Sequence, residues 1–281
     1  MLSCIYGLIS GVRIQFKNKD YVFIREFIIK MKVLVVCKDP EDSNESESCK
    51  MIGDKGFDVV YAWKNTLSKV ESKEIDLVIS IGGDGTALSA SHNIEDKPLL
   101  AVNSNPGKSE GALTTLDISQ LDEKLEELKS GKINGEKLER IEVYVNDKRI
   151  PMLALNEVFV GNEKAYLMSK YKLKFNDGIE EQRSSGIIFS TGTGSSAWFK
   201  SAGGVPFSAQ SKYIKMIVRE PYLRSLKKFS MVHETIREKD EVEVELLDDS
   251  ILVIDSIREF KLKKGDKAKV KISDKPLMRV I

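Results

Sequence analysis

The stretch "LVISIGGDGTALSA", residues 77–90, joins an apolar run to two glycines, an aspartate, a third glycine and a threonine. The apolar run over 76–82 is typical of a strand that is buried on both faces. Gly82 and Gly83 lack a Cβ atom, so the chain can turn sharply after this strand and approach a ligand closely. We expect a helix over 86–93 after the turn, and a strand, turn and helix in this order predict an α/β domain.

Strands and helices alternate on both sides of this stretch. Apolar β-branched runs predict the strands, and turn residues or leucines spaced by three and four predict the helices. This alternation predicts a parallel, doubly wound sheet in an N-terminal α/β domain. The predicted strands are 32–37, 57–63, 76–82 and 98–104, the predicted helices are 44–55, 86–93 and 119–132, and the predicted domain spans 31–137.

A second domain follows, because the pattern changes after residue 138. Short segments there alternate charged and apolar residues, and turn signals separate them at Asn146-Asp147 and at Asn176-Asp177-Gly178. The pattern predicts a C-terminal β-rich domain over 138–268 that is mostly antiparallel.

The composition narrows the classes of partner and site. Among 281 residues, 44 basic and 43 acidic side chains leave a net charge of +1, which gives no support to a nucleic-acid or membrane surface. The three cysteines form no CxxC pair, so we expect neither a disulfide framework nor a zinc site, and we predict a cytoplasmic protein. We interpret both histidines, His92 and His233, as structural.

The N-terminal segment 1–30 contains the apolar stretch "CIYGLISGV". This stretch is too short to span a bilayer, and no basic residue or cleavage signal accompanies it. We treat 1–30 as an extension of uncertain role. It either precedes a start at Met31 or adds a strand or an oligomer arm.

The glycine-rich turn can carry phosphate chemistry. Backbone N–H groups that lead into a helix bind phosphate oxygens, and Asp84 could accept a proton from a hydroxyl or lie near a phosphate-bound metal. The stretch matches neither GxxxxGK[ST] nor GxGxxG, which argues against a P-loop and a Rossmann fingerprint. The alternative is an ordinary strand–helix connection in which Asp84 caps the helix.

The GGDGT motif after an apolar strand resembles the signature shared by NAD kinases, diacylglycerol and sphingosine kinases, and 6-phosphofructokinases. Three further segments resemble NAD kinases in particular and appear in the right order. They are "AVNSNPGKSEGALT" (101–114), "LNEVFVG" (155–161) and "QRSSGIIFSTGTGSSAWFKSAGG" (182–204). The resemblance covers residues 31–281.

Four positions depart from the common family pattern. Ser185 replaces the usual aspartate, Gly192 the usual proline, Ser196 a threonine and Trp198 a tyrosine. With these features the chain is similar to the divergent branch that includes the animal mitochondrial enzymes. Ser185 removes one expected contact to the nicotinamide end, which is expected to loosen discrimination between NAD and NADH.

The resemblance implies a reaction and a site. Asp84 would be the general base for the adenosine-ribose 2′-hydroxyl of NAD, which attacks the γ-phosphate of ATP. Mg²⁺ would enter with the ATP phosphates, without dedicated protein ligands. The substrate-binding residues implied by the resemblance are Gly83, Gly85, Thr86, Asn156, Glu157, Arg183, Ser185, Thr193, Ser196, Ala197, Trp198 and Ser201.

The resemblance also implies that segment 269–281 returns to the first domain and that the protein forms a homodimer or homotetramer. ATP and polyphosphate stay open as phosphoryl donors, and NAD and NADH as acceptors. Two alternative functions share the same features: a lipid kinase of the diacylglycerol type, and a catalytically inactive dinucleotide sensor.

Overall fold

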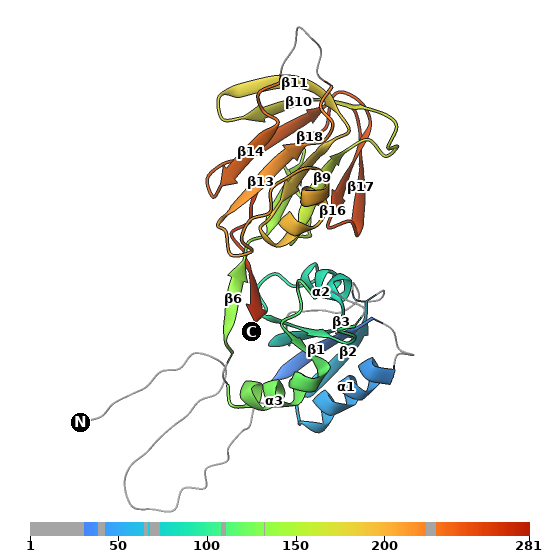
Figure 1. Cartoon of the computed structure of the whole chain (residues 1–281), viewed down its shortest axis with the longest axis vertical. Helices are drawn as coiled ribbons and strands as arrows, with labels where there is room; N and C mark the ends of the chain where they lie inside the picture. The colour runs from blue at the N-terminus through green and yellow to red at the C-terminus, as the bar shows by residue number, and fades with distance from the viewer. Residues whose placement is uncertain are drawn as a thin grey trace, which may run out of the picture.

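A computed structural model describes residues 31–38, 43–64, 67, 74–107, 111–131, 133–222 and 229–281. The extension predicted over 1–30 lies outside the described residues. The described chain forms two domains stacked along the long axis, with strands β6 and β19 at the junction (Figure 1).

The first domain is built on one mixed sheet with helices on both faces. The strands run in the order β2-β1-β3-β4-β19-β6, with β5 beside β4, and all pairs are parallel except β6 with β19. Its elements are β1 (Lys32–Cys37), α1 (Ser43–Asp54), β2 (Asp58–Trp63), β3 (Leu77–Gly82), α2 (Asp84–Ser91), β4 (Leu99–Asn103), β5 (Leu116–Asp117), α3 (Ile118–Lys129), β6 (Gly135–Leu138) and β19 (Leu277–Val280).

The two faces of this sheet have separate cores, because alternate residues of a strand point to opposite sides. On β1, Val33 and Val35 join the core that contains Leu121 of α3, whereas Leu34 joins the core that contains Ala87 of α2. Figure 1 shows α1 and α3 on one side of the sheet and α2 on the side that faces the second domain. The prediction of a doubly wound α/β domain is confirmed.

The second domain is a sandwich of two antiparallel sheets. Their strand orders are β11-β10-β15-β18-β7-β8 and β14-β13-β12-β9-β16-β17. The elements are β7 (Ile141–Val145), β8 (Lys148–Arg149), β9 (Glu157–Gly161), β10 (Ser169–Phe175), β11 (Gly178–Ser184), β12 (Ile187–Ser190), the 3₁₀ turn η3 (Thr193–Ser196), α4 (Trp198–Ser201), β13 (Tyr213–Val218), β14 (His233–Arg237), β15 (Val242–Leu246), β16 (Ser250–Ile254), β17 (Arg258–Leu262) and β18 (Lys267–Ile272).

Strands β9 and β12 are buried on both faces. Packing on both sides fixes these strands, and with them the residues before β9 and after β12. Phe189 points into the sandwich core, whereas Ile188 packs under Phe199 of α4 on the outer face. The predicted turns are present, since Asn146, Asp147 and Asn176 all have positive φ angles, as tight hairpins require. The prediction of an antiparallel β-rich domain is confirmed.

The chain crosses between the domains twice. Strand β18 stays in the sandwich as far as Ile272, and β19 then enters the first sheet beside β4 and β6. Arg140, between β6 and β7, is fully buried and donates hydrogen bonds to the carbonyls of Ile94, Glu95 and Lys275. This guanidinium therefore ties both crossings to the segment that follows α2.

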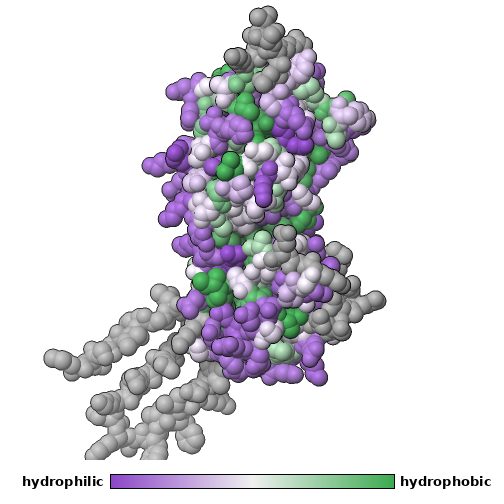
Figure 2. All heavy atoms as spheres, viewed as in Figure 1, coloured by the Kyte–Doolittle hydropathy of each residue, from purple (hydrophilic) through white to green (hydrophobic). Residues whose placement is uncertain are grey.

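The described surface mixes hydrophilic and hydrophobic residues. On the face in view, hydrophobic residues form small patches that hydrophilic residues separate (Figure 2). No helix within the described ranges has the length and apolar character needed to cross a membrane.

Candidate active site

Asp84 is the first residue of α2, and its carboxylate is held from outside the helix. Oδ1 accepts a hydrogen bond from the Leu113 N–H at 2.8 Å, and Oδ2 accepts one from the Ala112 N–H at 3.0 Å. Gly83 is the N-cap residue, and no side chain caps this helix, so the alternative of Asp84 as a helix cap is wrong. A carboxylate oxygen can accept two hydrogen bonds, so each oxygen of Asp84 can take one more donor.

The backbone that holds Asp84 is itself supported by the C-terminal strand. Nη1 of Arg279, on β19, donates to the Ala112 carbonyl at 3.2 Å and to the Leu113 carbonyl at 3.4 Å. Nε of Arg279 donates to Glu136 Oε1 on β6 at 2.9 Å. The return of the chain to the first sheet therefore fixes the loop that fixes the candidate base.

Two glycines of the turn, Gly82 and Gly85, let neighbouring side chains lie close to the backbone. Gly82 has a φ of +150°, and a Cβ there would lie 2.4 Å from Oγ1 of the buried Thr86. Gly85 is exposed, and a Cβ there would lie 3.3 Å from Lys64 Nζ. An ammonium group beside a helix N-terminus is a favourable place for phosphate. Sequence reasoning missed Lys64, which follows β2 without any motif around it.

In the second domain, strand pairing brings the Asn156-Glu157 pair to the glycine-rich segment. Glu157 faces Ser190 across the β9–β12 ladder, and the Thr191 N–H donates to the Asn156 carbonyl at 2.9 Å. A Cβ on Gly194 would lie only 2.3 Å from the same carbonyl oxygen. Glycine at 194 therefore lets the η3 turn lie directly against Asn156.

Three buried polar atoms of this cluster have no hydrogen-bond partner among the described residues. They are Asn156 Oδ1, Glu157 Oε2 and Thr193 Oγ1. Buried polar atoms are nearly always paired in proteins, so these three atoms are candidates to accept hydrogen bonds from a polar ligand. Burial, together with the nearby charge of Asp255, raises the pKa of Glu157 to about 7, while a hydrogen bond from Ser256 opposes the shift.

His92 connects this cluster to the helix of Asp84. Its Nε2 lies 2.7 Å from Asp255 Oδ2, and both side chains are essentially inaccessible to solvent. The Asp255 carboxylate also accepts hydrogen bonds from the backbone N–H groups of Leu155, Asn156 and Glu157, at 2.8 to 2.9 Å. The structural role predicted for His92 thus links α2 to the Asn156-Glu157 backbone.

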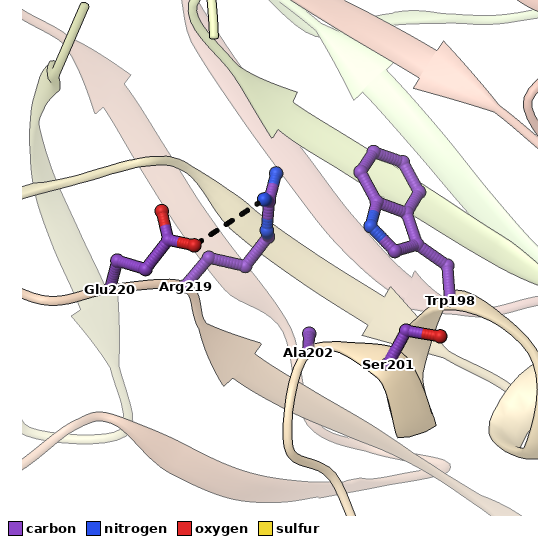
Figure 3. Close-up of a pocket in the computed structure, with 5 residues that line it drawn as sticks. All are labelled: Trp198, Ser201, Ala202, Arg219 and Glu220. Atoms are coloured by element: carbon purple, nitrogen blue, oxygen red, sulfur yellow. Dashed lines mark ion pairs between the residues drawn. The ribbon is translucent and has the colours of Figure 1, made fainter. Parts of the chain in front are cut away.

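Trp198 lines a cavity on the outer face of the sheet that contains β9 and β12 (Figure 3). Its indole packs against Phe159 in a tilted arrangement, with ring centroids 4.9 Å apart, and the Arg219 guanidinium lies 5.4 Å from the centroid of the Trp198 ring. The cavity holds about 120 Å³ and is lined by Trp198, Ser201, Ala202, Arg219 and Glu220. Sequence reasoning missed Arg219, which the end of β13 brings to Trp198.

The other predicted residues are placed as follows. The Ser185 N–H donates to the Arg219 carbonyl at 3.0 Å, so Ser185 lies beside the strand end that bears this guanidinium. Arg183 is exposed on β11, where the alternate residues Gln182 and Ser184 face the core. Ser196, the last residue of η3, and Ala197, which joins η3 to α4, are both exposed.

The departure at Gly192 has a steric explanation. A Cβ there would lie 1.9 Å from the Ser208 carbonyl oxygen. Next to it, Ser195 Oγ lies 2.7 Å from the Gly192 carbonyl and 2.9 Å from the Phe207 carbonyl, to either of which it can donate its one proton, and it accepts the Phe207 N–H. This chain therefore folds the segment around 207–208 tightly over its glycine-rich turn.

Comparisons with known proteins identify a family. The family model described as ATP-NAD kinase N-terminal domain matches residues 17–133, and the model described as ATP-NAD kinase C-terminal domain matches residues 155–281. The first match begins inside the predicted extension, and the two matches together cover most of the chain.

Individual relatives support the same assignment. An NAD kinase of Thermoplasma volcanium is 26% identical over 252 residues, which are 88% of this chain and 85% of that protein. NAD kinase 2, mitochondrial, of Rattus norvegicus is 30% identical over 52% of this chain and 44% of its own length. A probable NADH kinase of Oryza sativa subsp. japonica is 30% identical over 59% and 58%.

Solved structures show the same two-domain fold. An NAD kinase from Archaeoglobus fulgidus in complex with ATP superposes with a TM-score of 0.70 at 20% identity, covering 89% of this chain and 94% of that chain. A yeast NADH kinase complexed with NADH gives a TM-score of 0.73 at 16% identity, covering 90% and 84%. From the two family models and the shared fold, this chain belongs to the NAD kinase family.

Proposed function

We propose that this protein transfers the γ-phosphoryl group of ATP to the 2′-hydroxyl of the adenosine ribose of NAD or NADH. The observation that carries the proposal is the set of unpaired atoms Asn156 Oδ1, Glu157 Oε2 and Thr193 Oγ1. The Asn156 and Glu157 backbone is joined to the helix of Asp84 through Asp255 and His92. Two neighbouring unpaired acceptors fit the two donors of a vicinal ribose diol.

Asp84 would accept the proton of the attacking hydroxyl. Its carboxylate is fixed by two backbone N–H groups and can take a further donor, so it would orient the hydroxyl as well as remove the proton. Lys64 and the N–H groups at the start of α2 would bind the transferred phosphate.

Mg²⁺ would be held mainly by ATP. The described residues contain no group of three His, Cys, Asp or Glu side chains arranged to hold a metal ion. A metal bound to the phosphates would neutralise their charge, and positioning is the main task left to the protein in phosphoryl transfer.

The dinucleotide would lie along the glycine-rich segment, with one of its rings at the Trp198 cavity. An indole beside an arginine offers a flat apolar face and a positive charge, which suit an aromatic ring and a phosphate or carboxamide oxygen. The cytoplasmic location and the homodimer or homotetramer stay predictions, and light scattering of the purified protein tests the oligomer.

One assay separates the kinase from the alternatives. Purified protein is incubated with NAD, ATP and Mg²⁺, and product is detected with an NADP-specific dehydrogenase, while NADH and polyphosphate are tested in parallel. We expect NADP formation that falls by roughly 10²- to 10⁴-fold in Asp84→Asn, with NAD binding retained. NAD binding without turnover by the unaltered chain would instead favour the sensor, and phosphorylation of a diacylglycerol would favour the lipid kinase.

A further inference from the structure

Cys37 and Cys49 lie together although nothing in their spacing predicts it. Their Sγ atoms are 2.7 Å apart, with Cys37 at the end of β1 and Cys49 in the middle of α1. The expectation of no disulfide came from an odd number of cysteines without a CxxC pair. Packing of α1 on β1 brings the two thiols into contact instead.

We propose that Cys37 and Cys49 form a redox modification site, in which a hydroperoxide converts the two thiols into an intramolecular disulfide. A disulfide bond is about 2.05 Å long, so the sulfur atoms need to approach by only about 0.7 Å. This proposal is independent of the phosphoryl transfer proposed above.

The surroundings fix the approach of the two sulfur atoms. Tyr61 Oη, on β2, donates to the Cys49 carbonyl at 2.9 Å, which holds α1 against the sheet. The buried Glu45, one turn before Cys49, accepts the Lys38 N–H at 2.7 Å, which holds α1 against the end of β1. Both elements are therefore anchored on either side of the thiol pair.

The two thiols have different roles because they differ in access and acidity. Cys49 is half-buried, whereas Cys37 is 1% exposed. The hydrogen bond between them lowers the pKa of Cys49, against the opposing effects of burial and Glu45, and together with burial it raises the pKa of Cys37. Cys49 is therefore the attacking thiolate, and Cys37 is the resolving thiol.

The reaction balances with a hydroperoxide as the oxidant. The Cys49 thiolate attacks one peroxide oxygen, the O–O bond breaks, and the leaving hydroxide takes up a proton to form water. Cys37 sulfur then attacks the sulfenic sulfur of Cys49, the S–S bond forms, and hydroxide leaves with the Cys37 proton as a second water. Two thiols and one hydrogen peroxide thus give one disulfide and two waters, and an added dithiol reverses the change.

The test uses the full chain with Cys4→Ser, since Cys4 lies outside the described residues and could otherwise compete. The reduced protein is exposed to equimolar hydrogen peroxide, remaining thiols are blocked with N-ethylmaleimide, and intact mass and peptide maps are recorded. We expect the loss of two hydrogens, a cross-linked peptide pair containing Cys37 and Cys49, and full reversal by dithiothreitol.

Two single variants test the assigned roles. Cys37→Ser should stop at a sulfenic acid on Cys49 that dimedone labels, and Cys49→Ser should leave Cys37 unreactive while the protein stays folded. Two maleimide adducts on the peroxide-treated parent, or a dimedone adduct in place of the cross-link, would overturn the proposal. Because that decisive measurement uses a chain that keeps both thiols, poor folding of a single variant does not affect it.

Discussion

His92 and Asp255 are 163 positions apart in sequence and share a 2.7 Å hydrogen bond in the buried contact between the two domains. His92 follows the last turn of α2, whose first residue is Asp84. Asp255 accepts the backbone N–H groups of Leu155, Asn156 and Glu157. The pair therefore joins the helix of the candidate base to the segment that would bind the ribose.

Removal of His92 should impair the chemical step more than binding. His92→Ala leaves one acceptor site of the buried Asp255 unfilled and removes one hydrogen bond between α2 and the second domain, so we expect kcat to fall roughly 10- to 100-fold with KM changed far less. The cost in unfolding free energy should be about 1–3 kcal/mol. Steady-state kinetics and urea unfolding measure both effects.

A conservative variant and a matched histidine provide the controls. His92→Gln keeps an N–H donor toward Asp255 and should recover part of kcat. His233, exposed on β14, is the other histidine of the chain, and His233→Ala should leave the kinetics unchanged. Equal kcat values for His92→Ala and the unaltered protein would refute a positioning role.

Arg279 should affect turnover from the end of the chain. Arg279→Ala removes the support of the Ala112 and Leu113 carbonyls, whose N–H groups hold Asp84, so kcat should fall about 10-fold. Arg279→Lys keeps the positive charge but lacks the planar guanidinium, so its kcat should lie between those of Arg279→Ala and the unaltered protein. Arg237→Ala, on the exposed side of β14, is the matched control, and a loss of the same size there would indicate a general charge effect.

Glu157 should make stability depend on pH. Its pKa in the folded protein, about 7, lies above the ordinary value of 4.5, so the native state keeps a proton that the unfolded chain loses. The associated stability is complete below about pH 4.5 and is lost as the pH rises through 7. Glu157→Gln removes this titration and should be more stable than the unaltered protein by roughly 3 kcal/mol at pH 8.

The pH dependence distinguishes titration of Glu157 from a general effect of removing a carboxylate on stability. The stability difference for Glu157→Gln should shrink toward zero as the pH approaches 5, whereas Glu259→Gln, exposed on β17, should show a small difference at every pH. Urea unfolding at pH 5 and pH 8 gives both comparisons. A constant difference for Glu157→Gln would show that the buried carboxyl does not titrate in this window.

Restoring the usual proline at residue 192 should destabilise the protein. Gly192 has a φ of −60°, which suits proline, but a Cβ there would lie 1.9 Å from the Ser208 carbonyl oxygen. Gly192→Pro should therefore destabilise the protein by about 1–3 kcal/mol. Gly107→Ala, where the nearest atom would be 3.7 Å away, is the control in thermal unfolding. An unchanged melting temperature for Gly192→Pro would show that the segment around Ser208 yields freely.

The sequence by itself determined the two domain classes and predicted most residues of the candidate site. Apolar runs, leucine spacing and turn residues report local burial and backbone geometry, which is why the strand at 77–82 and the turn at Asn146-Asp147 follow from them. Asp84 and the Asn156-Glu157 pair were found because they lie in contiguous motifs. Lys64 and Arg219 were missed because each is a single charged residue at a strand end, and the sequence does not distinguish such a residue from an ordinary solvent-exposed one.

Only the tertiary structure decided which distant side chains meet. The contacts of His92 with Asp255, of Arg279 with the Ala112 carbonyl, and of Cys37 with Cys49 depend on how helices pack on the sheet and how the two domains join. Periodicity says that a residue is buried but not what it faces, because the facing residue is set by packing between elements that are remote in sequence. The alignment of the candidate base with the segment proposed to bind the ribose is therefore a property of the folded junction.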